Sequence, residues 1–156
     1  MSKKLRILYA EDEALLREVT TELLIGEGYE CSSVQNGLEA KILLQNYEFD
    51  LVITDFEMPR MDGAQLLFWM RKSGIHNPVI FVSGNMERAH SEEIALGDCC
   101  TSLLIKPISI DQLVEAITSS LSRDHDFDCH EETTHSENVS IFPGQHFRKS
   151  ELALKD

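Results

Sequence analysis

The fold of this chain is decided by the stretch Asp50-Leu51-Val52-Ile53-Thr54-Asp55-Phe56-Glu57-Met58-Pro59-Arg60-Met61-Asp62-Gly63. Its first residues are β-branched and aliphatic, which predicts a buried strand that ends at Asp55. Pro59 and Gly63 then predict a loop, because proline has no N–H group to continue a sheet ladder. A carboxylate in this position either closes a turn or lies at the mouth of an open α/β sheet, where ligands bind.

Similar apolar runs predict further strands over residues 5–10, 29–34, 79–82 and 103–105. Apolar residues at helical spacing predict a helix that ends at Gly26 and Gly28, another after Asn36-Gly37, and others over 63–71, 86–96 and 110–121. In the first of these helices, one face carries Leu15, Leu16, Val19, Leu23 and Leu24. Alternating strands and helices predict an α/β fold, a doubly wound parallel sheet of five strands with helices on both faces.

The length and charge of the chain limit the classes of function that it can have. Its 156 residues suffice for one domain with a core, and its formal net charge of −13 argues against binding to a phosphate backbone. An acidic protein suits a cation site and partners with basic surfaces. No apolar stretch has transmembrane length and the first residues do not resemble a signal peptide, so we expect a cytoplasmic protein with reduced cysteines and no membrane insertion.

Four chemically active residues follow the predicted ends of different strands: Asp12, Asp55, Ser83 and Lys106. The carboxyl ends of parallel strands share one edge of a sheet, so these side chains are expected to meet there. Converging carboxylates repel one another unless a cation neutralises them, and oxygen ligands favour Mg²⁺. A carboxylate nucleophile, Mg²⁺, a lysine and a hydroxyl are the groups that phosphoryl transfer to an aspartate requires.

The sequence resembles the receiver domain of two-component response regulators. The resemblance covers residues from about 3 to 122 and is carried by short motifs that follow the predicted strands, namely Glu11-Asp12-Glu13, Asp55 with Met58-Pro59-x-Met61-Asp62-Gly63, Ser83-Gly84 and Lys106-Pro107. It implies the flavodoxin-like receiver fold over residues 1–122. It also implies a function: a histidine kinase or a histidine phosphotransfer protein phosphorylates the domain, which then signals through changed contacts with a downstream protein.

The resemblance also implies a role for each site residue. Asp55 would be the phospho-acceptor, and Mg²⁺ would be held by Asp12, by Asp55 and by the backbone carbonyl of Glu57. Glu11 would hold a metal-bound water. Lys106 would pair with Asp55 and then with the phosphoryl group, and Ser83 would hydrogen-bond a phosphoryl oxygen. Such a domain catalyses only its own phosphorylation and slow dephosphorylation, so it is not an enzyme in the usual sense.

Two departures from the family pattern affect these expectations. Glu11 occupies a place where aspartate is commoner, and Leu103 occupies a place where the family usually has Tyr or Phe. Without that aromatic residue, the route by which phosphorylation changes the surface is left open, as is dimerisation on phosphorylation. Two alternatives also stay open: a phosphatase with an aspartate nucleophile, in which Glu57 would be the general acid, and a degenerate receiver that binds a partner without being phosphorylated.

The composition changes after residue 122, where the chain becomes acidic and rich in Ser, Thr and His. We expect residues 123–156 to be a largely disordered tail, and its charge and length argue against a DNA-binding output domain. His125, Cys129, His130 and His135 match no zinc-site spacing. Within the domain, Phe68 and Trp69 are expected to face solvent or to be partly covered by neighbouring elements.

Overall fold

The computed structural model describes residues 2–85, 87–88, 100–122, 138–142 and 145–148. Five strands form one parallel sheet in the order β2-β1-β3-β4-β5. These strands are β1 (Arg6–Ala10), β2 (Glu30–Val34), β3 (Leu51–Asp55), β4 (Val79–Ser83) and β5 (Thr101–Ile105). The predicted fold class and the five predicted strands are therefore confirmed.

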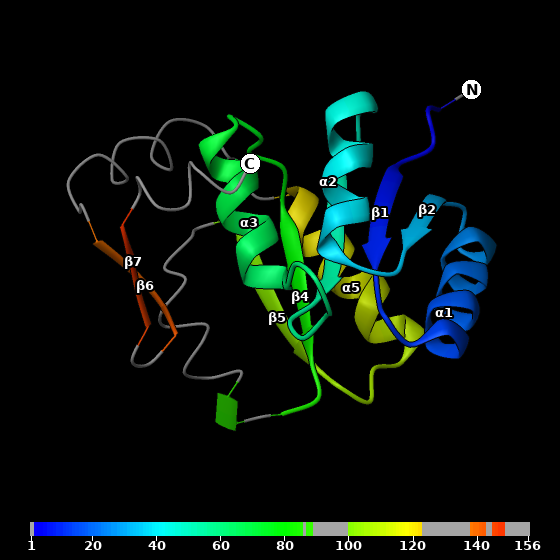
Figure 1. The fold of residues 1–156 in the computed structure, drawn as a ribbon. Helices are drawn as coiled ribbons and strands as arrows, with labels where there is room; N and C mark the ends of the chain where they lie inside the picture. The colour runs from blue at the N-terminus through cyan, green and yellow to red at the C-terminus, as the bar shows by residue number, and fades with distance from the viewer. Residues whose placement is uncertain (1, 86, 89–99, 123–137, 143–144, 149–156) are drawn as a thin grey trace.

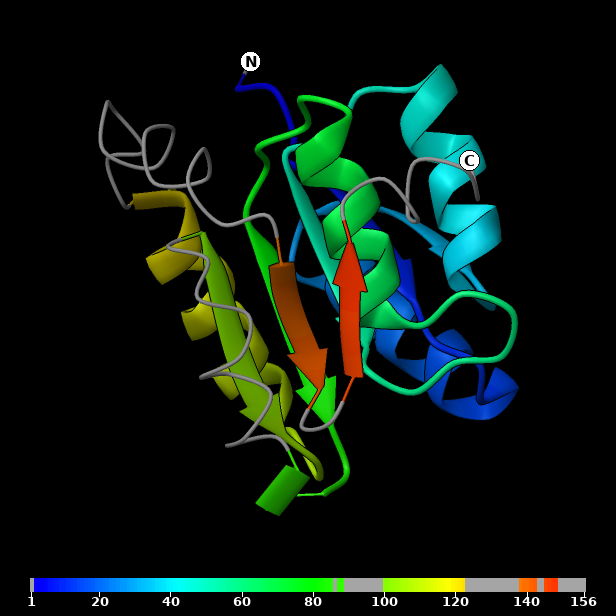
Figure 2. The same cartoon turned by 60° about the vertical axis from the view of Figure 1, so that its left-hand side comes forward.

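Four helices of the described residues cover the two faces of this sheet: α1 (Ala14–Gly26), α2 (Gly37–Asn46), α3 (Gly63–Lys72) and α5 (Ile110–Ser122). Helices α1 and α5 lie on one face, and α2 and α3 lie on the other (Figure 1). The turned view shows α3 and α5 on opposite sides of β4 (Figure 2). The helix predicted over residues 86–96 lies almost entirely outside the described residues; only 87–88 are seen, and they are helical.

The three inner strands, β1, β3 and β4, bury side chains on both faces, because successive residues of a strand point to opposite sides. In β1, Leu8 and Ala10 belong to the core under α2 and α3, whereas Ile7 and Tyr9 belong to the core under α1 and α5. The inner strands β3 and β4 are buried along their whole length. This burial holds the ends of β1, β3 and β4 in a fixed register, with Ala10 beside Thr54 and Asp55 beside Val82.

Helix α1 does not bury the whole apolar face that its sequence suggested. Of its residues only Leu24 is buried, whereas Leu15, Val19 and Leu23 are exposed. Those three residues are spaced four apart, so they form one stripe, and Leu24 lies about 100° around the helix from Leu23. The helix thus turns Leu24 toward the sheet and leaves an apolar stripe at the surface.

Trp69 follows the second of its two expected placements, because neighbouring elements cover it and it does not face solvent. It is only 7% exposed and belongs to the core under α2 and α3. The Nζ atom of Lys41 in α2 lies 5.2 Å from the centroid of its ring. The neighbouring helix α2 covers this side of α3, which the spacing of apolar residues within α3 could not reveal.

A second, antiparallel pair of strands, β6 (Asn138–Phe142) and β7 (Gln145–Arg148), lies within the segment that we expected to be largely disordered. The rest of that segment, including the four residues considered as a zinc site, lies outside the described residues, so the predicted disorder of the tail stays a prediction. In the described part of the chain, no helix has the length and the apolar content needed to span a bilayer.

Candidate functional site

The predicted site residues all lie at or directly after the carboxyl ends of strands. Glu11 and Asp12 come directly after β1, Asp55 and Ser83 are the last residues of β3 and β4, and Lys106 comes directly after β5. The backbone also ties these ends together, because the N–H group of Lys106 donates to the carbonyl of Ser83 at 2.7 Å. The sheet therefore gathers these residues at one edge, as the sequence predicted.

Three carboxylates converge at this edge. Glu11, Asp12 and Asp55 each offer one oxygen, and these oxygens all lie within 4.8 Å of one another. Glu11 and Asp55 are buried, whereas Asp12 is exposed at the mouth of the cluster. The N–H group of Glu57 donates to Oδ1 of Asp55 at 3.1 Å and so helps to orient that carboxylate.

Lys106 is the cation that faces these acids. Its Nζ atom donates to Oδ2 of Asp55 at 2.7 Å and to Oε2 of Glu11 at 2.9 Å. Burial alone would lower the pKa of Lys106, but the hydrogen bonds to Asp55 and Glu11, and their charges, raise it above its ordinary value. Lys106 is therefore fully charged at neutral pH, and its ammonium group bridges two carboxylates.

Glu11 lies deeper than the sequence suggested. It is 1% exposed, and its carboxylate contacts Lys106 directly. Burial raises the pKa of Glu11, the hydrogen bond from Lys106 opposes that rise, and the charge of Asp55 adds to it. Folding thus holds a carboxylate in a place where its charge is costly unless cations surround it.

The cluster suits a hard divalent cation. All its donors are carboxylate oxygens, with no thiolate or imidazole among them, and Lys106 forms ion pairs with two of the three acids. Such a donor set favours Mg²⁺, which binds a few carboxylates and keeps several waters. The carboxylates of two expected ligands, Asp12 and Asp55, are gathered with that of Glu11, which was expected to bind the ion through a water. The third expected ligand, the carbonyl of Glu57, stays a prediction.

Ser83 is near the site, but its hydroxyl is engaged elsewhere in this structure. Its Oγ atom donates to the carbonyl of Asn85 and accepts from the N–H group of the same residue, both at 3.3 Å. The side chain is buried at the end of β4. The hydroxyl would have to leave Asn85 in order to bind a group on Asp55, so its expected role stays a prediction.

The loop after Asp55 packs tightly against Asp55 itself, which explains why position 63 is a glycine. A Cβ atom on Gly63 would lie 2.4 Å from the carbonyl oxygen of Asp55 and 3.2 Å from Cε1 of Phe81. Asp62 begins helix α3 with a capping box, in which its side chain accepts from the N–H group of Gln65 at 2.8 Å. The loop is thereby fixed at both of its ends.

Leu103 occupies the place where an aromatic residue was expected from the family pattern. It packs against the core under α2 and α3, and it lies beside Phe81 in the sheet. Phe81 in turn stacks on Phe56, the residue after Asp55, with ring centroids 4.4 Å apart. The aromatic contact next to the site is therefore made by Phe81 of β4 and not by the residue at position 103 of β5.

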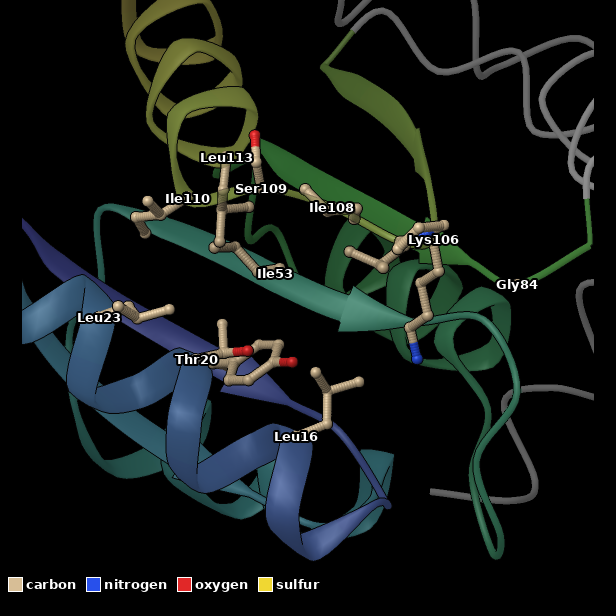
Figure 3. A pocket seen from close by; sticks show the side chains of 13 residues that line it. Leu16, Thr20, Leu23, Ile53, Gly84, Lys106, Ile108, Ser109, Ile110 and Leu113 are labelled. Atoms are coloured by element: carbon tan, nitrogen blue, oxygen red, sulfur yellow. The ribbon is translucent and has the colours of Figure 1, made fainter.

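An open pocket of about 430 Å³ lies next to Lys106, between α1 and the segment that joins β5 to α5 (Figure 3). On the α1 side it is lined by Leu16, Thr20 and Leu23, and on the other side by Ile108 and Ile110. Leu23 also belongs to the exposed apolar stripe of α1, whose other members, Leu15 and Val19, do not line the pocket. An apolar surface thus borders the acidic site directly.

One contact at the mouth of the site was not predicted from the sequence. Glu57, in the loop after β3, forms an ion pair with Arg88, in the segment after β4. Arg88 falls in the segment 86–96, over which the sequence predicts a helix. Its opposite charge, and its place shortly after a strand end, were the only signals in the sequence that could have indicated the pair.

A doubly wound parallel sheet, with an acid cluster and one lysine at its carboxyl edge, is the arrangement of a signal receiver domain. The family model of the response regulator receiver domain matches residues 7–118. The polar-differentiation response regulator DivK of Brucella anthropi is 31% identical over 117 residues, which cover 74% of this chain and 94% of DivK. The sensor histidine kinase RcsC of Escherichia coli is 31% identical over 112 residues, which cover 72% of this chain and 12% of the kinase.

Solved structures agree with this assignment. A response regulator receiver protein from Sinorhizobium medicae superposes with a TM-score of 0.68 at 28% identity, covering 76% of this chain and 95% of that one. The response regulator TrrA of Thermotoga maritima, in complex with Mg²⁺ and BeF, gives a TM-score of 0.66 at 30% identity, covering 75% and 99%. The chain belongs to the response regulator receiver domain family.

Proposed function

We propose that this chain accepts a phosphoryl group on Asp55 from a histidine kinase or a histidine phosphotransfer protein, in a reaction that depends on Mg²⁺. The observation that carries the proposal is the contact of Lys106 Nζ with Asp55 Oδ2 at 2.7 Å, beside the converging carboxylates of Glu11 and Asp12. A nucleophile, a cation and a metal-binding acid cluster occupy one small volume. Positioning and charge neutralisation are most of what phosphoryl transfer needs.

In the reaction, a carboxylate oxygen of Asp55 attacks phosphorus, the P–N bond to the donor histidine breaks, and the leaving imidazole takes a proton from solvent. The N–H group of Glu57 holds the Asp55 carboxylate in orientation. Lys106 offsets the negative charge of the phosphoryl oxygens, because its ammonium group is fixed beside the acceptor. Ser83 would donate to one of those oxygens after its hydroxyl leaves Asn85.

Mg²⁺ would be held by the carboxylates of Asp12 and Asp55 and by the backbone carbonyl of Glu57, with Glu11 binding through a water. When bound, Mg²⁺ supplies positive charge that offsets the oxygens of the transferred group. Glu11 has a second part in this arrangement, because its contact with Lys106 holds the ammonium group toward the acceptor.

The donor protein needs a surface on which to dock, and the border of the site offers one. Helix α1 exposes Leu15, Val19 and Leu23 next to the pocket beside Lys106. An apolar helix face of the donor would cover this stripe and bring its histidine to the sheet edge. The product is a changed surface that binds a downstream protein in the cytoplasm, until water hydrolyses the acyl phosphate.

The proposal is tested by incubating the protein with acetyl phosphate and Mg²⁺ and measuring its intact mass. The wild type should gain one phosphoryl group that hydroxylamine removes, and Asp55→Asn should gain none. An unmodified wild type would support a receiver that acts without phosphorylation. Turnover of an added phosphate monoester, faster than self-hydrolysis, would support a phosphatase instead.

A further inference from the structure

An ion pair at the mouth of the site bridges the loop after β3 and the segment after β4, and the proposed chemistry gives it no role. The carboxylate of Glu57 and the guanidinium of Arg88 are in direct contact, 31 positions apart in the sequence. Their side chains are 64% and 47% exposed, respectively. Exposed pairs of this kind are weak, and their partners exchange easily. The pair is therefore suited to being broken by a stronger anion.

Backbone hydrogen bonds connect each member of this pair to the reacting groups. The N–H group of Glu57 donates to Oδ1 of Asp55 at 3.1 Å. The N–H group of Arg88 donates to Oδ1 of Asn85 at 3.0 Å, and the N–H group of Asn85 donates to Oγ of Ser83 at 3.3 Å. A chain of contacts thus runs from the acceptor carboxylate through the ion pair to the hydroxyl at the end of β4.

The guanidinium also influences an acid beyond its partner. Burial raises the pKa of Asp62, and hydrogen bonds from backbone N–H groups oppose that rise, as does the charge of Arg88. The charge of Arg88 therefore acts on Asp62, at the start of α3, as well as on its partner Glu57. A guanidinium binds carboxylate and phosphoryl oxygens with the same planar donors, and it binds a doubly charged anion more strongly.

We propose that Arg88 is an exchangeable cation, which Glu57 holds while Asp55 is unmodified and which the phosphoryl group on Asp55 attracts away. This inference rests on the proposed function, since it concerns how phosphorylation of Asp55 is felt outside the reacting groups. The exchange would break the contact between the loop after β3 and the segment after β4. It would also pull on Asn85, which holds the hydroxyl of Ser83.

The test must distinguish this exchange from direct electrostatic repulsion between the Glu57 carboxylate and an anion at Asp55. Removing the charge of Glu57 would favour any anion at Asp55 through space, whether or not Arg88 moves. In the exchange, however, the effect of Glu57 depends on Arg88, because Glu57 acts by competing for it. A double-mutant cycle measures this dependence, since independent sites add and coupled sites do not.

The test uses the full chain with Mg²⁺ and beryllofluoride, a mimic of the phosphoryl group, and measures the dissociation constant by calorimetry. Glu57→Gln should tighten binding by about threefold and Arg88→Gln should weaken it by about threefold, near the lower end of measured pair couplings. In the Arg88→Gln background, Glu57→Gln should change binding by less than about 1.5-fold. The lifetime of the acyl phosphate should follow the same order.

The matched control is Glu30→Gln, which removes another exposed pair, Arg6–Glu30 at 3.7 Å, from the opposite edge of the sheet. It should leave beryllofluoride binding unchanged. If the two substitutions at positions 57 and 88 add independently, the exchange is refuted while the proposed function stands. If the wild type neither binds beryllofluoride nor accepts a phosphoryl group, the proposed function itself is refuted. Circular dichroism of each variant confirms that it is folded.

Discussion

Replacing Lys106 with methionine should make the folded protein less stable, to an extent that depends on pH. Methionine keeps much of the aliphatic stem but removes the ammonium group that bonds Asp55 at 2.7 Å and Glu11 at 2.9 Å. The two carboxylates would then face each other without a cation, and Glu11 is almost fully buried. Breaking a buried ion pair in this way typically costs about 3–5 kcal/mol.

The expected cost here is somewhat smaller, about 2–3 kcal/mol at pH 7, because the side chain of Lys106 is 25% exposed and water can reach the site. The folded pKa of Glu11 is already raised, so its contribution to stability is present below its ordinary pKa and is lost as the pH rises through the folded value. Without Lys106 that folded pKa rises further. The difference between variant and wild type should therefore shrink on acidification.

At alkaline pH, too, the difference in stability between wild type and the Lys106→Met variant should shrink. The folded pKa of Lys106 is raised, so its contribution is complete below its ordinary pKa and disappears as the pH rises through the folded value. Wild type and variant should converge at both extremes and differ most near neutral pH. Urea unfolding across this pH range measures the difference, with Lys41→Met as a control that should cost only about 0.5–1 kcal/mol. A neutral-pH difference below about 0.5 kcal/mol, or one that does not vary with pH, would refute the reasoning.

Three further outcomes are expected. Mg²⁺ at about 100 times its dissociation constant should add about 2.7 kcal/mol to the free energy of unfolding, and Asp12→Asn should remove most of that gain; an equal gain in the variant would place the ion elsewhere. Gly63→Ala should lower the free energy of unfolding by about 1–3 kcal/mol in a denaturant titration, because the added Cβ atom meets the carbonyl of Asp55. The control is Gly26→Ala, which should not lower it, because there is open space around Gly26. Leu23→Asp should slow phosphotransfer from a protein donor at least severalfold and leave the reaction with acetyl phosphate unchanged; equal slowing of both reactions would remove α1 from the docking surface.

The sequence was sufficient to predict where the reacting groups meet. Asp55 ends a run of buried residues, and Asp12 and Lys106 follow two other strands, so the parallel sheet leaves little freedom in their placement. The periodic signals in strands and helices reflect burial against the sheet, which is a property of each element. They therefore predicted the strands and most helices correctly.

Contacts between elements could not be predicted in the same way. The burial of Trp69 depends on how α2 crosses α3, and the exposure of Leu15 and Val19 depends on how α1 is turned about its axis. Whether Glu11 would contact water or Lys106 depends on the rotamer of a buried side chain. The pair of Glu57 and Arg88 joins the loop after β3 to the segment after β4, and the periodic pattern within one element does not predict a contact with another.

The most direct measurement is a crystal structure of the protein with Mg²⁺ and beryllofluoride. If Asp55 is the phospho-acceptor, beryllium should be bonded to an oxygen of Asp55, Nζ of Lys106 should contact a fluoride, and Mg²⁺ should be bound by the carboxylate of Asp12. Beryllofluoride on another residue, or Mg²⁺ bound away from Asp12 and Asp55, would contradict the proposed site.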